Sequence, residues 1–506
     1  MKINGFEKLR DIRTFSLVKC EGEHTSLNFT ARTAANIALT FLSREGNPIT
    51  ISRDDGSTLF YGLIREVSVS ESHHGAIVAV RANSFSILAD EEPHTRIFQN
   101  PNQTLGDILK KISWDKAKCE LDLDEAADKK PSGLIVADKA TNAVVQNDET
   151  DFSFLLRLAH MVGYRLFIAD TIRGRTTLEL GKTRGSKKIS AKEIITLTRQ
   201  QRKGKFNLKL RAKPTAELDV GTVARIEGLT GAFVVVKKSV VKQHETFIFI
   251  YELESADDMP NQSASNGQGG CERIFSAKIT SADDPKKFGR VQVAFDGEDM
   301  AKNPSERLWI PWRTSYGGKD GQGGIVFLPD KNDRAEILLA GNNLVASNNF
   351  RTGCLLNECS KPSEKYIGNN FKQRIFWREK SLELFSADNM IFMDEKKIEL
   401  VTGKGKTRIR LEEDKIFMQT PDNLVELSPA GIKIKTDKDF ATESGKNLTN
   451  KSGGSLKLES GKDLTAKSGD SLKIESNKDF ETNAHGSGKI KSSSTLKLNG
   501  STVEIS

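Results

Sequence analysis

The sequence predicts a mainly β protein whose C-terminal part is a threefold bundle of interwound strands. Three observations lead to this prediction: an eight-residue repeat near the C-terminus, strand-like runs between turn residues in the N-terminal half, and a compact strand-rich stretch between them. The repeat is the most informative. It is plain in residues 444–475, which divide into SGKNLTNK, SGGSLKLE, SGKDLTAK and SGDSLKIE.

The repeat keeps one register from Ser428 to Gly500 without gaining or losing a residue. Its fifth place is Leu, Ile or Phe in every complete octad except the one that carries Gly488, and its seventh place is often apolar. The predicted core residues of this register are Ile432, Phe440, Leu448, Leu456, Leu458, Leu464, Leu472, Ile474, Phe480, Ile490, Leu496 and Leu498.

An even period suits a β-strand, because strand side chains alternate between two faces and places five and seven then share one face. In a helix of 3.6 residues per turn the same row would drift around the cylinder. Ser-Gly at the first two places supplies a turn. One chain of this kind buries too little to form a core, so we expect three copies to bring their apolar rows onto a common axis with threefold symmetry. The alternatives are a disordered polar tail and a single-chain β-solenoid.

Length and composition further narrow the range of possible functions. A chain of 506 residues predicts three or four domains. The net charge of +8 comes from interspersed Lys/Arg and Asp/Glu, which does not indicate a nucleic-acid partner. The five cysteines are odd in number and mostly far apart, which favours folding in a reducing compartment. We see no apolar signal-peptide region and no run long enough to span a membrane.

The N-terminal half predicts strands and two helices. Residues 38–42 and 60–64 are β-rich runs, with a turn at residues 54–57, and strands return through residues 215–255. Residues 102–113 predict a short amphipathic helix. A second helix follows the acidic cap at residues 147–151 and ends near Gly163, with its apolar residues at helical spacing.

Composition shifts divide the chain into segments, the clearest boundary being the Gly/Ser/Asn-rich linker. The predicted segments are 1–255, 256–270 (linker), 271–345 (a compact barrel), 346–387 (connector) and 388–506 (the repetitive prism).

Candidate chemistry is sparse. His73 and His74 are adjacent and would point to opposite faces of a strand, so they rarely share a metal ion. His485 is alone in its octad, and only threefold symmetry could bring three copies to one axial metal; we keep it as a weak candidate. Nothing indicates a nucleophile–base pair or a cleft with paired carboxylates. We therefore expect no enzyme activity, no catalytic residue and no cofactor.

Two further motifs carry a resemblance to a known family. The first runs from Gln146 through an acidic cap and a Phe/Leu/Arg helix to Gly163-Tyr164. The second lies in the compact barrel and includes Asp284-Pro285, the turn before Arg290, and a Trp-Ile-Pro-Trp stretch. Its marker residues are Gly289, Val291, Trp309, Pro311, Trp312, Gly324 and Pro329.

With the octads, these motifs resemble the VgrG-type spike proteins of type VI secretion systems, which unite a phage late-control-D-like hub with a tail spike. The resemblance covers nearly the whole chain. It implies β-barrel hub subdomains with inserted helices over residues 1–255, an OB-fold domain over 271–345 and a triple-stranded β-helix needle over 388–506. Two departures are the Lys331–Glu336 stretch before the last barrel strand and the exit through residues 344–351.

The resemblance also implies partners. They are two further copies of the chain, an Hcp-like hexameric tube protein, baseplate proteins, secreted effectors, and a PAAR-like tip protein that would contact Val503 and Ile505. The spike would assemble in the cytoplasm and be ejected through a target membrane without inserting stably. The alternatives are the spike of a contractile phage tail or extracellular injection particle, and a cell-wall hydrolase with a fibrous stalk.

Overall fold

The computed structural model describes residues 2–72, 75–202, 205–243, 246–256, 272–316, 325, 327–347, 363–369 and 371–505. It divides the chain into two compact units, residues 1–354 and 355–506. Mainly β structure is confirmed. Nearly all of the predicted linker, and the residues His73, His74 and Gly324, lie outside the described ranges.

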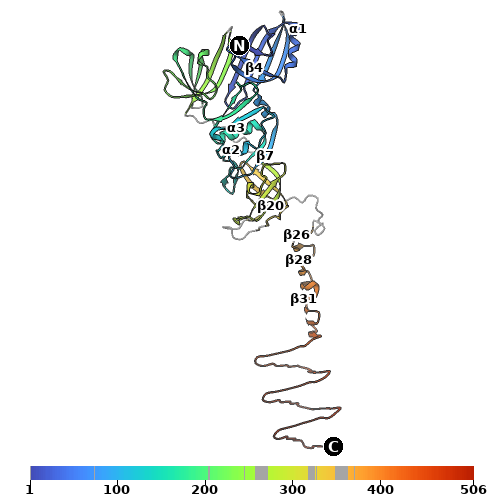
Figure 1. Cartoon of the computed structure of the whole chain (residues 1–506). Coiled ribbons are helices and arrows are strands. Elements are labelled where there is room, and N and C mark those ends of the chain that lie inside the picture. Colours follow the sequence, from blue (N-terminus) through green and yellow to red (C-terminus); the bar gives the residue numbers. More distant parts are fainter. Residues whose placement is uncertain are drawn as a thin grey trace. The chain divides into compact units, whose positions relative to one another are not determined.

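The largest sheet of the first unit has twelve strands, drawn mainly in blue and green in Figure 1. Its main path runs β1-β4-β5-β6-β3-β2-β18-β19-β16-β15, and β17 joins β18 to β14. As described, the path is open rather than a closed ring. Its strands are β1 (Lys2–Asn4), β2 (Asp11–Cys20), β3 (Ser26–Thr33), β4 (Pro48–Ser52), β5 (Thr58–Ser72), β6 (Gly75–Asn83), β14 (Ser186–Ile189), β15 (Ile194–Arg202), β16 (Lys205–Ala212), β17 (Val223–Ile226), β18 (Phe233–Gln243) and β19 (Thr246–Ser255).

The strand predicted at residues 38–42 is wrong. That segment forms helix α1 (Ala35–Ala38) and a 3₁₀ turn over Leu39–Arg44. Ala38 and Phe41 are buried, and the Phe41 ring stacks on Phe6 with centroids 5.3 Å apart. Only a helical turn places residues three apart on one face, whereas a strand would send them to opposite faces. The predicted strand at 60–64 lies within β5, and the turn at 54–57 is present.

A helical layer with two small sheets follows in the same unit. Helix α2 (Leu105–Leu109) is shorter than predicted and begins with a capping box between Thr104 and Asp107. Helix α3 (Asp151–Met161) agrees with the prediction, and Gly163 follows it with φ +76°. The sheets have the orders β11-β7-β22 and β12-β13-β8. Their strands are β7 (Pro93–Phe98), β8 (Cys119–Asp122), β11 (Val144–Thr150), β12 (Arg165–Ala169), β13 (Thr176–Gly181) and β22 (Glu298–Asp299).

A seven-stranded sheet, in the order β10-β9-β25-β24-β20-β21-β23, forms the segment predicted as a compact barrel. Its strands are β9 (Ile135–Val136), β10 (Lys139–Ala140), β20 (Arg273–Ser281), β21 (Arg290–Phe295), β23 (Ile310–Pro311), β24 (Arg334–Ala340) and β25 (Asn343–Ser347). Strands β9 and β10 come from the N-terminal half. The core of this sheet also includes Ile97, Leu134 and Val145, so residues far apart in sequence complete it.

The second unit contains a nine-stranded antiparallel sheet in which every strand pairs with the next one in sequence. We call residues 365–436 the meander; it begins inside the range predicted as a connector. Its strands are β26 (Lys365–Gly368), β27 (Gln373–Trp377), β28 (Ser381–Ser386), β29 (Asn389–Asp394), β30 (Lys397–Thr402), β31 (Thr407–Glu412), β32 (Ile416–Gln419), β33 (Asn423–Ser428) and β34 (Gly431–Thr436).

Residues 437–505, which we call the octad segment, follow a wide winding path drawn in red in Figure 1. The sequence predicts short strands here, but no residue of this segment is assigned to a strand in the single chain. A strand needs a neighbour about 4.8 Å away to complete its ladder, and successive windings of one chain do not provide it. Strand pairing of the octads therefore stays a prediction.

Candidate functional site

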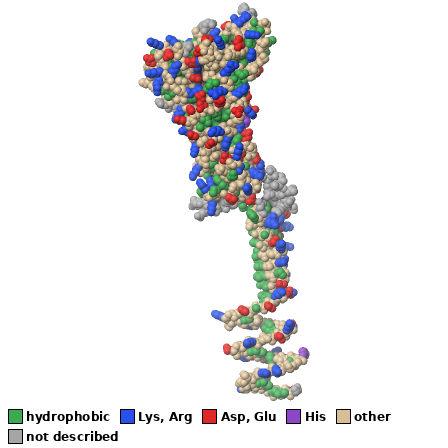
Figure 2. All heavy atoms as spheres, viewed as in Figure 1, with side chains coloured by type: hydrophobic (Ala, Val, Ile, Leu, Met, Phe, Trp, Pro, Cys, Tyr) green, Lys and Arg blue, Asp and Glu red, His purple; other side chains and the backbone are tan. Residues whose placement is uncertain are grey.

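One face of the meander is apolar from its second strand to its last. The strand register aligns two neighbouring columns of apolar side chains, and the one charged residue in their register is Lys365, which pairs with Trp377 at the start of the second column. The first column is Ile367, Ile375, Leu384, Ile391, Leu400, Ile409, Met418, Val425 and Ile434; the second is Trp377, Leu382, Met393, Ile398, Leu411, Ile416, Leu427 and Ile432. Central members such as Leu400 remain 41% exposed. Figure 2 shows a band of hydrophobic side chains along this segment.

The opposite face of the meander mixes aromatic and charged side chains that satisfy one another. Glu399 accepts a hydrogen bond from Lys397 at 3.0 Å and lies 3.5 Å from the Arg408 guanidinium. The Arg410 guanidinium stands 4.5 Å from the centroid of the Phe417 ring. These contacts pair several of the charges within one chain, whereas the large side chains of the apolar face stay exposed.

The octad segment continues the same two rows. Ile432 and Ile434 occupy the fifth and seventh places of the first octad, and they are also the last members of the two columns. The predicted core residues after them are all exposed in the single chain; Leu456, for example, is 62% exposed. The fifth-place row therefore extends the apolar register of the meander through the octads with one break at Gly488, while the seventh place is apolar only in some octads.

The serine that begins most octads has a role that the repeat pattern did not reveal. Its hydroxyl donates to the carbonyl oxygen three residues later, as from Ser460 to Asp463 at 2.8 Å and from Ser476 to Asp479 at 2.8 Å. The same hydroxyl often accepts from the backbone N–H two residues on, as Ser460 does from Lys462 at 3.4 Å. Such a local turn fixes the corner between extended stretches. The octad at Ala484 has no hydroxyl to do this.

His485, Val503 and Ile505 are exposed in the single chain. The residues that the structure describes contain no group of three or more His, Cys, Asp or Glu side chains able to hold a metal. The tip contact and the axial metal remain predictions.

The OB motif is built around an ion pair. Arg290 donates to both carboxylate oxygens of Asp284, at 2.6 and 2.8 Å, and the same oxygens accept from the backbone N–H groups of Lys286 and Phe288. These hydrogen bonds, led by those from Arg290, hold the pKa of Asp284 well below its ordinary value. Gly289, at φ +66°, completes the loop. The Asp and Arg of the motif are therefore spaced so that their ion pair closes the loop between them.

The remaining OB residues lie in or beside the core of this domain. Val291 is fully buried, and Trp312 is half-buried against the same cluster. Trp309 lies beside Arg290, with 6.0 Å between the guanidinium carbon and the ring centroid. Pro311 ends the short strand β23, and Pro329 directly follows the exposed side chains of Phe327 and Leu328. These positions are those of structural residues in a small domain.

The hub motif holds the junction between β11 and α3. The fully buried Gln146 donates to Asp151 and to the carbonyl oxygen of Glu149, both at 2.8 Å. Arg96 on β7 ion-pairs with Asp151 and donates to Gln146 at 3.0 Å. Arg157 on α3 binds Glu149 at 2.8 Å. Each polar residue of the motif thus fixes where the helix begins.

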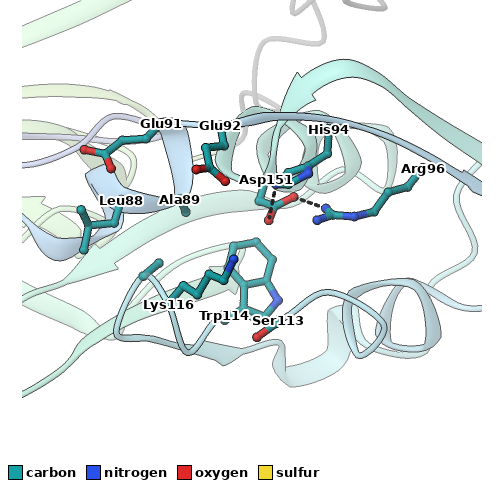
Figure 3. A pocket seen from close by; sticks show the side chains of 11 residues that line it. Leu88, Ala89, Glu91, Glu92, His94, Arg96, Ser113, Trp114, Lys116 and Asp151 are labelled. Carbon is teal, nitrogen blue, oxygen red and sulfur yellow. Dashed lines mark hydrogen bonds and ion pairs between the residues drawn. The ribbon is translucent and has the colours of Figure 1, made fainter. Parts of the chain in front are cut away.

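An open pocket of about 220 Å³ lies beside this junction. Figure 3 shows His94, Arg96 and Asp151 on one side of it and Trp114 and Lys116 on the other. The Asp151 carboxylate is engaged by Arg96, and His94 lies 4.0 Å from it. Glu91, which also lines the pocket, pairs with Arg65 at 2.5 Å.

Hub and OB strands share a sheet. Strand β22 of the OB segment pairs in parallel with β7, and Gln99 donates to Asp299 at 2.9 Å. Arg96 also binds Glu298, at 2.7 Å. The two segments that the sequence separates are therefore parts of one compact unit.

A comparison with known protein families found a match for the OB segment. Residues 275–348 match the family model described as the type VI secretion system/phage-baseplate injector OB domain. No curated protein matches the chain. The chain thus carries an injector OB domain. The resemblance to VgrG-type spike proteins is confirmed, since the match falls on the segment whose motif indicated it.

Several solved structures are similar to the chain. A component of the type VI secretion system of E. coli has 16% identity and a TM-score of 0.49, covering 68% of this chain and 99% of that one. A tail protein from Neisseria meningitidis has 11% identity and a TM-score of 0.38, covering 50% and 95%. A prophage tail protein from Shewanella oneidensis has 12% identity and a TM-score of 0.37, covering 49% and 95%.

Proposed function

We propose that this chain is the puncturing spike of a contractile type VI secretion apparatus and acts as a homotrimer. The observation that carries the proposal is the apolar register that runs from the meander to the last octads with one break at Gly488, in a chain that also holds an injector OB domain. Soluble monomers rarely leave contiguous apolar patches of this extent open to water. Three copies would bury the rows on a common axis and close the strand edges around it.

In this proposal the function is mechanical. The hub segment caps a tube of stacked hexameric rings, baseplate proteins surround it, and contraction of a sheath drives tube and spike through a target envelope. The outer faces carry Lys, Asp, Glu and Ser, which have no affinity for the hydrocarbon core of a bilayer, so the spike passes through rather than lodging. A PAAR-like protein on Val503 and Ile505 would sharpen the tip, and effectors would travel with it.

We further propose that the chain is not an enzyme, assembles in the cytoplasm and then leaves the cell. Among the described residues, no helix combines the length and the apolar character needed to cross a membrane. A peptidoglycan zymogram tests the enzyme alternative: clearing by the purified protein would favour a hydrolase with a fibrous stalk.

Light scattering tests the trimer directly. The full-length protein should have a mass near three times 55.9 kDa, and a variant that ends at residue 385 should associate more weakly. A monomer whose C-terminal segment is readily cut by protease would contradict the spike.

The OB family match covers both secretion systems and phage baseplates. The spike of a phage tail or extracellular injection particle is therefore the second candidate. Gene neighbours separate the two: a membrane complex indicates secretion, and capsid or tail-fibre genes indicate a phage-derived particle.

A further inference from the structure

The two parts of the second unit satisfy their backbone groups in different ways. In the meander each strand is hydrogen-bonded to the next strand of the same chain, and β30, for example, pairs with both β29 and β31. The last backbone-to-backbone bond in the described residues runs from the N–H of Asp437 to the carbonyl of Asp422, at 2.9 Å. From there on, local bonds at the serine corners are the main contacts.

This difference decides which part can order itself first. A hairpin closes a short loop, so its ordering entropy is offset by ladder bonds within one chain. An octad strand has its potential ladder partners on other chains, so ordering it requires chains that are already aligned. The meander can therefore be structured before assembly, and the octads cannot.

The apolar face of the meander supplies the alignment. Nine strands spaced about 4.8 Å apart make each column roughly 40 Å long. Beyond Lys365 in the first strand the columns carry no charge, so a partner surface must be apolar along nearly the same length. Another copy of this chain offers that surface, and the columns lead into the octad rows at Ile432 and Ile434, whose fifth and seventh places repeat the same chemistry.

We propose that the meander is the assembly seed of the spike. Its apolar face binds the same face of two further copies, and this sets the register of the three chains. The octads then wind together from residue 437 toward the C-terminus. The inference rests on the proposed trimer and adds to it which segment holds the trimer and in which order it forms.

The order of assembly can be tested by introducing a charged residue into the full-length protein, either in the meander columns or in the octad rows. Leu400→Asp would bring three carboxylates into the apolar contact of the meander, whereas Leu456→Asp does the same in the octads. The matched controls are Lys435→Asp, on the opposite face of the meander, and Lys457→Asp, on the outer side of the octad. We expect Leu400→Asp to reduce the mass to that of one chain, and Leu456→Asp to keep the threefold mass but expose the octads to protease.

A cross-linking measurement tests the same contact without relying on Leu400→Asp, which could simply misfold the meander. Leu400→Cys should be joined between chains by a short thiol cross-linker, above the background that the native cysteines give in the unmodified protein. The cross-link should persist when Leu456→Asp is added, because the seed assembles without the octads.

The outcomes separate the two proposals. If the unmodified protein is a monomer, the spike itself fails. If it is a trimer but Leu456→Asp releases single chains or abolishes the Leu400→Cys cross-link, the seed is overturned while the spike stands. A Leu400→Asp protein that remains as stable a trimer as the Lys435→Asp control also overturns the seed.

Discussion

The buried ion pair between Lys19 and Asp170 gives the sharpest prediction about the hub. Lys19 lies on β2 and Asp170 directly after β12, and both side chains are almost completely buried. Burial alone would lower the pKa of Lys19, but Asp170 and Asp219 raise it above its ordinary value. The carbonyl of Asp170 also accepts from the N–H of Tyr61 at 2.7 Å, so this residue joins the large hub sheet to the neighbouring small one.

Asp170→Ala should destabilise this junction strongly. Removing one partner of a buried pair costs about 3–5 kcal/mol, because the other charge stays buried without compensation. Since Asp219 still lies in the field of Lys19, we take the lower end, about 3 kcal/mol, which is roughly a hundredfold rise in the local opening equilibrium at about 1.4 kcal/mol per factor of ten. Hydrogen exchange of the amides in β2 and β5 measures that equilibrium without assuming two-state unfolding of the whole chain.

The control is the double variant Lys19→Met/Asp170→Ala. Replacing both charges with apolar groups is often nearly neutral, so we expect the double variant to lose about 1 kcal/mol or less. If it opens as readily as Asp170→Ala alone, the two residues are not coupled and the reasoning is refuted.

Three further predictions concern the motifs. The pKa of Asp284 is lowered by the bond from Arg290, so its stabilising contribution is complete above the ordinary carboxylate pKa of about 3.9 and declines as the pH falls toward the lower folded value. Thermal unfolding followed from pH 6 to pH 2.5 should show this decline. The variant Asp284→Asn should make the unfolding temperature of the OB domain less dependent on pH. If the pH dependence of the variant equals that of the unmodified protein, the ion pair between Asp284 and Arg290 does not stabilise the domain as argued. Gln146→Ala should lower the free energy of unfolding by about 1–3 kcal/mol, because it leaves buried polar partners unsatisfied. Hydrogen exchange of the amides in the first turn of α3 should become faster. Exchange at the rate of the unmodified protein would show that Gln146 does not hold the junction between β11 and α3. Ser460→Ala removes an exposed corner bond worth about 0.5–1.5 kcal/mol, so the melting temperature should fall slightly, and Lys462→Ala should have no comparable effect.

Local signals predicted several elements correctly because short-range geometry decides them. Helix α3 follows from its Thr150 cap and the helical spacing of its apolar residues. Strand β5 follows from a β-rich run after a turn. The same reasoning was wrong at residues 38–42, where β-propensity gave way to the burial of Ala38 and Phe41 on one side of a helical turn. Propensity is a weak signal when a tertiary contact, here the ring of Phe6, competes with it.

The OB motif could be recognised from its order and spacing, but the function of its residues could not. Asp284 and Arg290 are six positions apart, and the spacing alone does not say that the two side chains meet. The corner serines of the octads are a similar case: the repeat marks Ser460 as regular, and only the geometry shows its hydroxyl bonded to the carbonyl of Asp463.

The sequence by itself determined the eight-residue register, the apolar row and the injector OB motif, because each depends on residues close together in the chain. Only the tertiary structure decided that β7 and β9 complete the OB sheets, that Lys19 meets Asp170 across 151 positions, and that the apolar columns extend back to Ile367. These contacts join segments through folding, and local propensity does not specify which distant strand will pair with which. The division between a self-paired meander and octads without partners in their own chain has the same origin, since a hydrogen-bond ladder belongs to two strands and not to the sequence of one.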